Sequence, residues 1–221
     1  MAQQQFALVK TDDFLGLENL QDKKASPFYI DFLAGKLRYR SNHAGLKNEM
    51  LARALGKKPK DSPRIVDATA GLGRDSFILS TLGFQITLLE KSDIIHALLE
   101  DALQRAACDA EMAPIIARMH LIHTDAVQWL SNLDQTQHPD ITYLDPMFPG
   151  REKSASVKKE MVVLQNVLAN QPDDASLLDT ALACSKLRVV VKRPRLAPSL
   201  SARAPHYSLT GKSSRFDIYL V

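Results

Sequence analysis

The sequence reads Val66-Asp67-Ala68-Thr69-Ala70-Gly71-Leu72-Gly73-Arg74-Asp75 between a short apolar run at residues 65–68 and a helical pattern at residues 74–82. A strand that turns through glycines into a helix is typical of the first unit of a parallel α/β sheet. Gly71 and Gly73 permit positive φ angles and let the backbone approach a ligand with no Cβ in the way. The stretch therefore predicts an α/β domain with a ligand site at this turn.

Apolar strands and amphipathic helices alternate along the rest of the chain. The predicted strands are residues 65–68, 85–90, 120–123, 141–145, 187–192 and 216–221. The predicted helices are residues 74–82, 93–108, 126–130, 159–169 and 175–184. This alternation indicates a mostly parallel sheet that helices cover on both faces.

The first 62 residues show a different pattern. Short apolar runs at residues 6–9, 28–32 and 37–39 predict strands, and residues 46–55 predict a helix that stops at Gly56. Residues 57–63 form a polar connection that Pro59 and Pro63 mark. We therefore predict a small N-terminal α/β appendage at residues 1–62 and a main domain at residues 63–221.

Composition excludes several classes of protein. The 221 residues are 45% hydrophobic and 24% charged, as in an ordinary globular protein. The chain contains no run of the ~18 apolar residues that cross a bilayer, and its polar first five residues lack the features of a signal peptide. Cys108 and Cys184 lack metal-site spacing, so we expect free thiols. We expect a cytoplasmic protein with no membrane partner.

Positive charge is unevenly distributed, although the formal net charge is only +3. No acidic residue lies between Asp179 and Asp217, or between Asp31 and Glu49. The basic residues of the two stretches are Lys186, Arg188, Lys192, Arg193, Arg195, Arg203, Lys212 and Arg215, and Lys36, Arg38, Arg40, His43 and Lys47. Such clusters suit a polyanion, because each neutralised phosphate releases counterions. The alternative is a solvated basic surface.

Glu90 stands at the end of the second strand of the main domain, 23 residues after Asp67. This is close to the ~20-residue spacing of an acid that binds ribose hydroxyls, so the turn and Glu90 together predict a nucleoside site. A dinucleotide site would need a third glycine where Ser76 stands, which disfavours NAD. S-adenosylmethionine fits better, because the loop N–H groups can bind its carboxylate and Asp67 or Asp75 its ammonium. The alternative is an ordinary tight turn.

Asp125 and Ala126 follow the third strand of this domain and begin a short helix. In an open α/β sheet, ligands lie beyond the carboxyl ends of the strands, so Asp125 is a candidate acceptor for the adenine amino group. Asp125 also has the residue type and position of a helix N-cap, which is the alternative interpretation.

The fourth strand ends in Asp145-Pro146-Met147-Phe148-Pro149. A base amino group is a poor nucleophile, so an enzyme that methylates one must offer rigid acceptors to the hydrogens of its nitrogen. The Asp145 carboxylate and the Pro146 carbonyl can be such acceptors, because the prolines restrict φ around them. Phe148 can stack on a base removed from its own stack. The alternative is a proline-rich turn with Phe148 in the core.

Metal and nucleophilic catalysis find no support in the sequence. His120 and His123 are three residues apart on a predicted strand, so their side chains point to opposite faces. No Gly-x-Ser-x-Gly elbow or papain-like cysteine context occurs. We therefore expect neither a bound metal nor a covalent intermediate.

Seven blocks of the chain carry a resemblance to a known family. They lie at residues 67–75, 89–91, 143–149, 153–155, 157–161, 189–194 and 215–219. The blocks Asp-Pro-Met-Phe-Pro at residues 145–149 and Arg-Phe-Asp-Ile-Tyr at residues 215–219 are the most specific. Together they resemble the bacterial ribosomal small-subunit RNA guanine-N2 methyltransferase J family, over nearly everything from about Asp22 to the C-terminus.

The resemblance implies a class I S-adenosylmethionine-dependent methyltransferase fold. That fold is Rossmann-like, and we expect a seven-stranded, mostly parallel sheet with an antiparallel final hairpin. The resemblance further implies S-adenosylmethionine as donor, S-adenosylhomocysteine as product, and methylation of the N2 amino group of one guanine near the 3′ end of small-subunit (16S) ribosomal RNA. The cofactor contacts it implies are Arg74, Asp75, Glu90, Lys91, Asp125, Ala126 and Asp145.

The expected partner is small-subunit ribosomal RNA or the assembled small subunit. Lys153, Lys158 and Lys159 would then join the basic C-terminal segment in holding RNA phosphates, and a monomer is compatible with this role. The alternatives are an adenine-N6 methyltransferase of DNA or RNA and a non-catalytic RNA-binding factor with the same fold. A dehydrogenase ranks below both, because the third glycine is missing.

Overall fold

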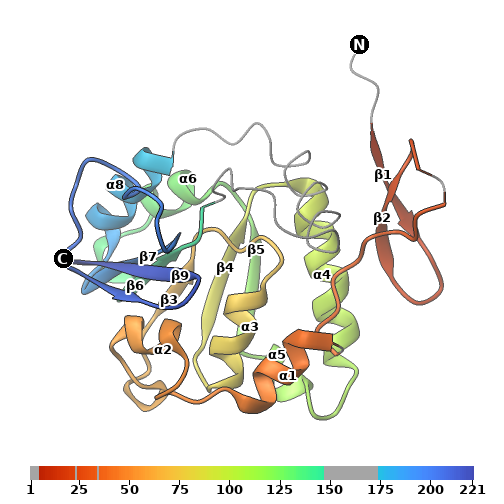
Figure 1. The fold of residues 1–221 in the computed structure, drawn as a ribbon, viewed down its shortest axis with the longest axis horizontal. Helices are drawn as coiled ribbons and strands as arrows, with labels where there is room; N and C mark the ends of the chain where they lie inside the picture. The colour runs from red at the N-terminus through yellow and green to blue at the C-terminus, as the bar shows by residue number, and fades with distance from the viewer. Residues whose placement is uncertain (1–4, 23, 34, 147–173) are drawn as a thin grey trace.

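The structure is a computed structural model that describes residues 5–22, 24–33, 35–146 and 174–221 (Figure 1). Its centre is a seven-stranded sheet with the strand order β5-β4-β3-β6-β7-β9-β8. The strands are β3 (Ile65–Asp67), β4 (Ile86–Glu90), β5 (Met119–His123), β6 (Ile141–Leu144), β7 (Arg188–Pro194), β8 (Tyr207–Thr210) and β9 (Ser214–Leu220). Neighbours from β5 to β7 pair in parallel, and β9 pairs antiparallel with β7 and β8. This confirms the seven-stranded, mostly parallel sheet and its antiparallel final hairpin.

Helices cover both faces of this sheet. The helices of the described residues are α1 (Gly35–His43), α2 (Met50–Leu55), α3 (Arg74–Thr81), α4 (Asp93–Ala107), α5 (Ala113–Ile116), α6 (Ala126–Ser131) and α8 (Asp174–Cys184), with two 3-10 turns, η1 (Pro59–Asp61) and η2 (Gln135–Gln137). Side chains of α2, α3 and α4 share one buried apolar cluster with alternate residues of the strands, such as Ile65 and Val190. Residues of α6 and α8 share a second cluster with the intervening residues, such as Val66 and Val191. The alternation follows from the two-residue period of a strand.

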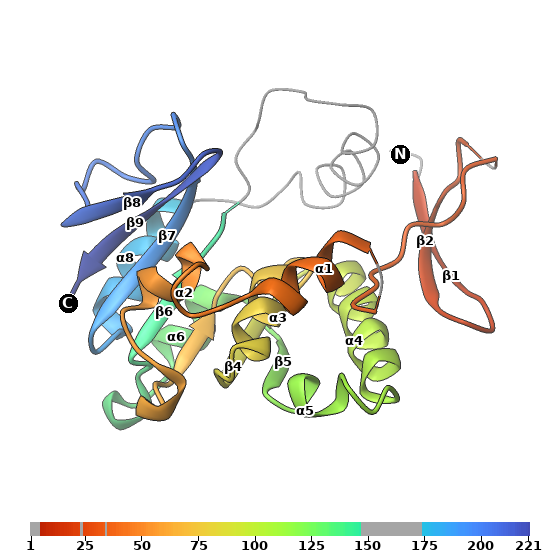
Figure 2. The same ribbon diagram turned by 60° about the horizontal axis from the view of Figure 1, so that its bottom comes forward.

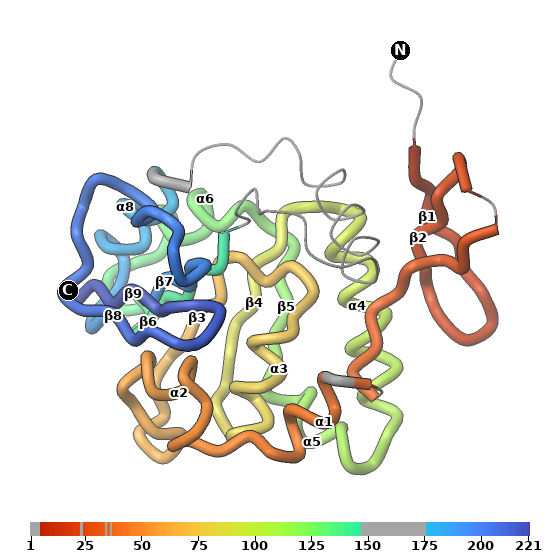
Figure 3. Tube along the Cα trace, in the orientation of Figure 1, coloured from red at the N-terminus to blue at the C-terminus, as the bar shows by residue number. Residues whose placement is uncertain are grey.

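A separate hairpin lies beside α4, away from the β7–β9 edge of the sheet (Figure 3). Its strands, β1 (Phe6–Lys10) and β2 (Leu15–Asn19), pair antiparallel. The Lys10 ammonium lies 2.8 Å from the Asp101 carboxylate of α4, and Leu17 of β2 is 2% exposed. The hairpin is therefore attached to the main sheet through α4.

Two strands predicted in the first 62 residues are wrong. Residues 37–39 belong to α1, which packs beside α3 (Figure 2). Arg40 on α1 pairs with Asp75 of α3 at 3.1 Å, so a contact from a distant part of the sequence favours the helix. Residues 28–32 contain only an isolated bridge between Phe28 and Leu17, and Pro27 just before it has no N–H to extend a ladder.

Residues before position 62 also contribute to the main core. The Phe32 ring stacks on Phe77 of α3 with centroids 4.9 Å apart, and Leu51 and Leu55 are 1% and 0% exposed. The division of the chain after residue 62 stays a prediction, which limited proteolysis between residues 57 and 63 would test. In the described part of the chain, no helix has the length and apolar character that a membrane crossing requires.

Candidate active site

Four predicted acids lie at the same edge of the sheet. Asp67 ends β3, Glu90 ends β4, Asp125 follows β5 and Asp145 follows β6. These four strands are parallel, so their carboxyl ends meet at one edge. The chain moves outward from β3 to β4 and β5 and then returns to the other side of β3 as β6. The acids therefore surround the point at which the strand order reverses, where open α/β sheets bind ligands.

Asp67 organises the glycine turn from within. Its carboxylate accepts hydrogen bonds from the backbone N–H of Thr69 at 3.1 Å and from the Ser76 hydroxyl at 2.5 Å. The residue is 3% exposed, and this burial raises the pKa of Asp67 to about 7 even though both hydrogen bonds oppose the rise. Ser76, which stands in place of a third glycine, thus holds the acid of the turn.

The two glycines of the turn have different tasks. Gly73 has a φ of 68°, and a Cβ built there would lie 2.8 Å from Leu99 Cδ1 and 3.3 Å from the Phe32 ring. Gly71 has a φ of 51°, and the nearest atom to its Cβ position is the Thr69 carbonyl oxygen at 3.8 Å. Gly73 is therefore required by packing, whereas Gly71 leaves space in front of the turn for a ligand.

Glu90 is held across the turn by backbone donors. Oε2 accepts from the Gly71 N–H at 3.0 Å, and Oε1 accepts from the Ser92 N–H at 2.8 Å. The residue is 5% exposed, and burial raises the pKa of Glu90 above its ordinary value, against the effect of these N–H groups. The two oxygens of a carboxylate can accept about four hydrogen bonds together, so Glu90 keeps acceptor capacity for a ribose hydroxyl.

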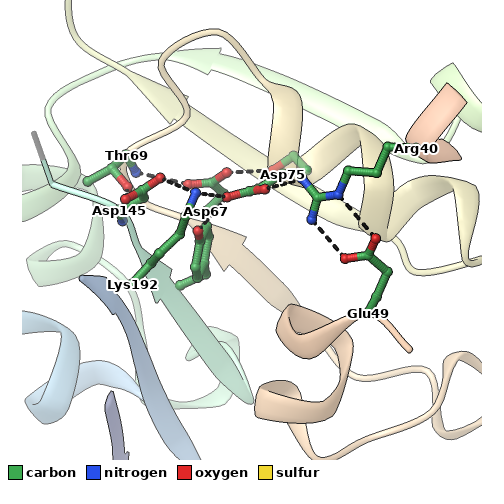
Figure 4. A network of polar contacts seen from close by, with 9 residues as sticks. Arg40, Glu49, Asp67, Thr69, Asp75, Asp145 and Lys192 are labelled. Carbon is green, nitrogen blue, oxygen red and sulfur yellow. Dashed lines mark hydrogen bonds and ion pairs between the residues drawn. The ribbon is translucent and has the colours of Figure 1, made fainter. Parts of the chain in front are cut away.

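Asp75, in the first turn of α3, is the centre of a network of charges (Figure 4). Its Oδ2 accepts from the Lys192 ammonium at 2.6 Å and from the Tyr143 hydroxyl at 2.7 Å, and its Oδ1 lies 3.1 Å from an Arg40 nitrogen. Burial alone would raise the pKa of Asp75, but Lys192, Arg40 and Tyr143 outweigh it and hold this pKa below its ordinary value. Arg40 also forms a two-point contact with Glu49, at 2.8 and 3.1 Å.

Asp145 is fixed through both its backbone and its side chain (Figure 4). Its N–H donates to the Thr69 hydroxyl at 2.6 Å, and its Oδ2 accepts from the Lys192 ammonium at 2.8 Å. The side chain is 39% exposed, so the carboxylate remains accessible. Burial raises the pKa of Asp145, Lys192 opposes the rise and the negative charge of Asp75 adds to it.

The remaining predicted site residues surround this centre. Asp125 caps α6, with its side chain accepting from the Gln128 N–H at 3.1 Å, and Ala126 is buried behind it. The N-cap interpretation of Asp125 is thus confirmed, and its contact with adenine stays a prediction. Arg74 and Lys91 are exposed next to the glycine turn and Glu90, and Pro146 is buried after Asp145. Phe148, the predicted helix at 159–169, and Lys153, Lys158 and Lys159 lie outside the described residues.

The histidines and cysteines of the described residues do not form a metal site. His120 and His123 are exposed on β5, and the His123 ring contacts the ring of His96 with centroids 4.5 Å apart. Within residues 5–22, 24–33, 35–146 and 174–221, no three histidine, cysteine or carboxylate side chains gather as a metal site requires. Cys108 and Cys184 are free thiols, as predicted.

Sequence reasoning missed the cations and the tyrosine of the network. Lys192 and Arg40 were counted only among the basic stretches, and Tyr143 only as part of a strand. One signal could have identified Lys192: it stands near the carboxyl end of the strand next to β6, at the same edge as Asp145. Arg40 had no such signal, because 35 residues separate it from Asp75 and its helix was predicted as a strand.

Several cations of the two basic stretches are paired with acids of the same chain or are buried. Arg215 makes a two-point contact with Asp217, at 2.8 and 3.0 Å, and Arg38 lies 3.1 Å from Glu111. Arg193 is 4% exposed. The acids Glu111 and Asp217, which pair with Arg38 and Arg215, lie outside the acid-free stretches. The number of basic residues in these stretches is therefore larger than the positive charge available to a polyanion. Arg195, Arg203 and Lys212 remain exposed.

The edge as a whole fits a cationic nucleoside. Glu90 offers acceptors to a ribose, and Gly71 leaves room in front of the turn. Around Asp75, three carboxylates (Glu49, Asp75 and Asp145) meet two cations (Arg40 and Lys192), which leaves a net negative charge for a sulfonium. These features suit S-adenosylmethionine better than a dinucleotide, whose phosphates would meet the same acids.

Comparisons with known proteins agree with this geometry. The family model described as "Putative SAM-dependent methyltransferase" matches residues 1–221. Ribosomal RNA small subunit methyltransferase J from Thioalkalivibrio sulfidiphilus is 51% identical over 194 residues, which cover 88% of this chain and 76% of the relative. The protein of the same name from Aeromonas hydrophila is 46% identical over 218 residues, which cover 98% of this chain and 87% of the relative.

Solved structures show the same relationship. The crystal structure of a SAM-dependent methyltransferase from Neisseria gonorrhoeae has a TM-score of 0.79 and 36% identity, and the match covers 100% of this chain and 84% of that one. An rRNA methyltransferase from Streptomyces viridochromogenes, at 14% identity and a TM-score of 0.52, shares the fold alone over 85% of this chain and 91% of its own. The chain belongs to the S-adenosylmethionine-dependent methyltransferase family that contains the ribosomal RNA small subunit methyltransferases J.

Proposed function

We propose that this protein transfers a methyl group from S-adenosylmethionine to the N2 amino group of one guanine in small-subunit ribosomal RNA. The observation that carries the proposal is the Asp145 carboxylate, which is held at the ligand edge of the sheet by Lys192 and is still 39% exposed. The names of the curated relatives support ribosomal RNA as the substrate.

The residues of the glycine turn and the neighbouring strand ends would hold the donor. Glu90 accepts the ribose hydroxyls, Gly71 admits the ligand, and Asp67 and Gly73 keep the turn in shape. Asp75 is partly satisfied by its cations and offers its remaining acceptor capacity to the ammonium of the donor. We assign Arg74 and Lys91 to the rim of this site, and Asp125 and Ala126 to the adenine end.

Asp145 and Pro146 would act on the amine of the base. The bound donor supplies an electrophilic methyl group on a sulfonium. An exocyclic amine attacks it only when its lone pair leaves the ring, and the Asp145 carboxylate stabilises that geometry by accepting an N–H hydrogen bond. The Pro146 carbonyl is a second acceptor, and we assign to Phe148 the stacking of the base. The proton lost after transfer passes to Asp145 or to water.

This reaction also bears on the place of action and on the RNA contacts of the enzyme. We propose that the enzyme acts in the cytoplasm on ribosomal RNA or on the assembled small subunit. The exposed Arg195, Arg203 and Lys212 are candidates for phosphate contacts, so RNA binding should weaken steeply with salt.

The test is a methylation assay with labelled donor on small subunits, naked small-subunit RNA and duplex DNA. We expect label in RNA, with mass spectrometry of the digested nucleosides showing N2-methylguanosine. Asp145→Asn should methylate RNA more slowly than the wild type, because an amide is a weaker acceptor than a carboxylate. Label only in DNA adenine would show the alternative enzyme, and failure to bind S-adenosylmethionine in calorimetry would show a non-catalytic RNA-binding protein.

A further inference from the structure

Lys192 connects two acids that have different tasks. Its ammonium lies 2.6 Å from Asp75 Oδ2 and 2.8 Å from Asp145 Oδ2, and its side chain is 28% exposed. The two acids come from different elements: Asp75 begins α3, and Asp145 follows β6. Lys192 itself comes from β7, which pairs with β6 in parallel. One cation therefore bridges the acid assigned to the donor and the acid assigned to the acceptor amine.

The contacts of Lys192 with Asp75 and Asp145 differ from an ordinary surface ion pair between one cation and one acid. An ammonium can donate three hydrogen bonds, and Lys192 uses two of them on carboxylates at short distance. Asp75 has further partners in Arg40 and Tyr143, whereas among the described residues Lys192 is the one cation within ion-pair distance of Asp145. Removing Lys192 would thus affect Asp145 more than Asp75.

We propose that Lys192 is a positioning residue of the methyl-transfer reaction, which orients the Asp145 carboxylate toward the acceptor amine and couples it to the donor side through Asp75. The Thr69 hydroxyl holds the backbone of Asp145 and Lys192 holds one of its two oxygens, so rotation of the carboxylate is restricted. The inference rests on the function proposed above.

Lys192 also favours the negatively charged form of Asp145, because it lowers a carboxyl pKa that burial raises. Without this cation, burial and the charge of Asp75 would favour a proton on Asp145, and a protonated acid accepts hydrogen bonds less well. Lys192 stays protonated itself, because Asp75 and Asp145 raise its pKa well above the ordinary value although burial lowers it. The charged and titratable groups around Asp145 are Lys192 and Arg193 of β7, Asp75 of α3, Asp67 of β3 and Tyr143 of β6.

The first measurement needs neither donor nor RNA. We would follow the carboxyl pKa of Asp145 by carbon NMR of protein with labelled aspartate, with the signal assigned through Asp145→Asn. Lys192→Met and Lys192→Gln should raise this pKa, and Lys192→Arg should leave it near the wild-type value. The matched control is Lys186→Met, because exposed Lys186 donates to the Thr136 carbonyl, away from the site. An unchanged Asp145 pKa in both uncharged variants would overturn the proposal.

The second measurement is steady-state kinetics on the RNA substrate. Loss of positioning costs on the order of 100-fold in rate, so we expect kcat to fall by about that factor in Lys192→Gln, with a much smaller rise in KM for the donor. The acid limb of the kcat–pH profile should move to higher pH in Lys192→Gln and return in Lys192→Arg. Thermal unfolding of every variant separates this effect from loss of the fold.

A double-mutant cycle makes the assignment specific. In an Asp145→Asn background, Lys192→Gln should reduce kcat by less than about threefold, because the group that it positions is already gone. Full additivity of the two losses would contradict a positioning role.

If the wild type methylates a different base while the NMR shift holds, the proposed substrate is wrong and the Lys192 contact stands. If guanine N2 is methylated and Lys192→Gln keeps wild-type kcat, this inference alone fails.

Discussion

Single side chains at the ligand edge combine burial with unused hydrogen-bonding capacity. Glu90 is held by two backbone N–H groups at 2.8 and 3.0 Å, so its position does not depend on a bound ligand. Such preorganisation means that binding of the donor loses little side-chain entropy at this residue. Single substitutions at this edge should therefore change the affinity for the donor and the pH dependence of stability.

Glu90→Gln should weaken binding of S-adenosylmethionine by about 10- to 100-fold. A hydrogen bond to a charged group contributes about 1.5–3 kcal/mol, and the variant replaces a charged acceptor by a neutral amide. Calorimetric titration measures the change. Glu100→Gln, on the exposed side of α4, is the matched control and should bind the donor as the wild type does. Equal affinities of both variants would remove Glu90 from the proposed site.

Asp67 makes the stability of the protein depend on pH. Burial raises the pKa of Asp67 from the ordinary 3.8 to about 7, so the folded state binds a proton more tightly than the unfolded state. The stability contributed by this proton is fully present below about pH 4 and is lost as the pH rises to about 7. Asp67→Asn removes the charge, and its amide can accept from the Thr69 N–H and donate to the Ser76 hydroxyl. Its stability relative to the wild type should therefore increase between pH 5 and pH 8.

Urea unfolding at these two pH values tests the prediction for Asp67. The relative gain is at most about 3 kcal/mol, because about two pKa units lie between pH 5 and the pKa of about 7 and each corresponds to about 1.4 kcal/mol. A constant difference between variant and wild type across the range would show that the carboxyl group titrates as it does in the unfolded chain.

At the scale of elements, the turn between β3 and α3 contains one glycine that the packing requires and one that leaves space for a ligand. Gly73 meets Leu99 and Phe32, whereas Gly71 faces space that a Cβ could enter. Both have positive φ, which costs a non-glycine residue about 1–2 kcal/mol. The two positions should therefore respond differently to the same substitution.

Gly73→Ala should lower the free energy of unfolding by about 2–4 kcal/mol, since steric overlap adds to the backbone strain. Gly71→Ala should cost only the strain, about 1–2 kcal/mol, and should in addition reduce donor affinity because its Cβ occupies the ligand space. Urea unfolding and calorimetry on both variants measure the two effects. Stronger destabilisation by Gly71→Ala than by Gly73→Ala would contradict this division.

For the whole molecule, the important question is which positive charges face solvent. The basic stretches contain many cations, but Arg215 is 15% exposed in the side chain and is paired with Asp217, which is 1% exposed. Arg203 and Lys212, from the same stretch, are exposed. A mutation at one of these positions should thus affect either folding or RNA binding, according to its burial.

Arg203→Gln should weaken RNA binding and lower the slope of log K against log salt by about 1, because one phosphate contact is lost. Arg215→Gln should instead lower the free energy of unfolding by about 3–5 kcal/mol, because it leaves the buried Asp217 carboxylate with the Ser208 hydroxyl but without its cation. Fluorescence anisotropy at several salt concentrations and urea unfolding separate the two outcomes. An unchanged salt slope in Arg203→Gln would place RNA on another face.

Most strands of the main domain, though not β8, and the acids at their ends were predictable from the sequence, because both are local properties. The alternation of apolar runs and helical patterns predicted the parallel sheet, and Glu90 and Asp145 were found because each directly follows a buried strand. The boundaries of α3 and β4 agreed with the prediction to within one residue, whereas the helix predicted at residues 46–55 begins only at Met50. Parallel pairing then brings these ends to one edge without further information.

The partners of the charges were decided only by the folded chain. Lys192 and Asp75 are 117 residues apart in sequence, and Arg40 and Asp75 are 35 apart, so no local pattern relates them. Residues 37–39 formed a helix for the same reason, since contacts with α3 outweigh a weak local preference for strand. Local periodicity specifies helices and strands, whereas an ion pair depends on how distant elements pack. This packing made Lys192 and Arg40, which the sequence placed only in basic stretches, parts of the site.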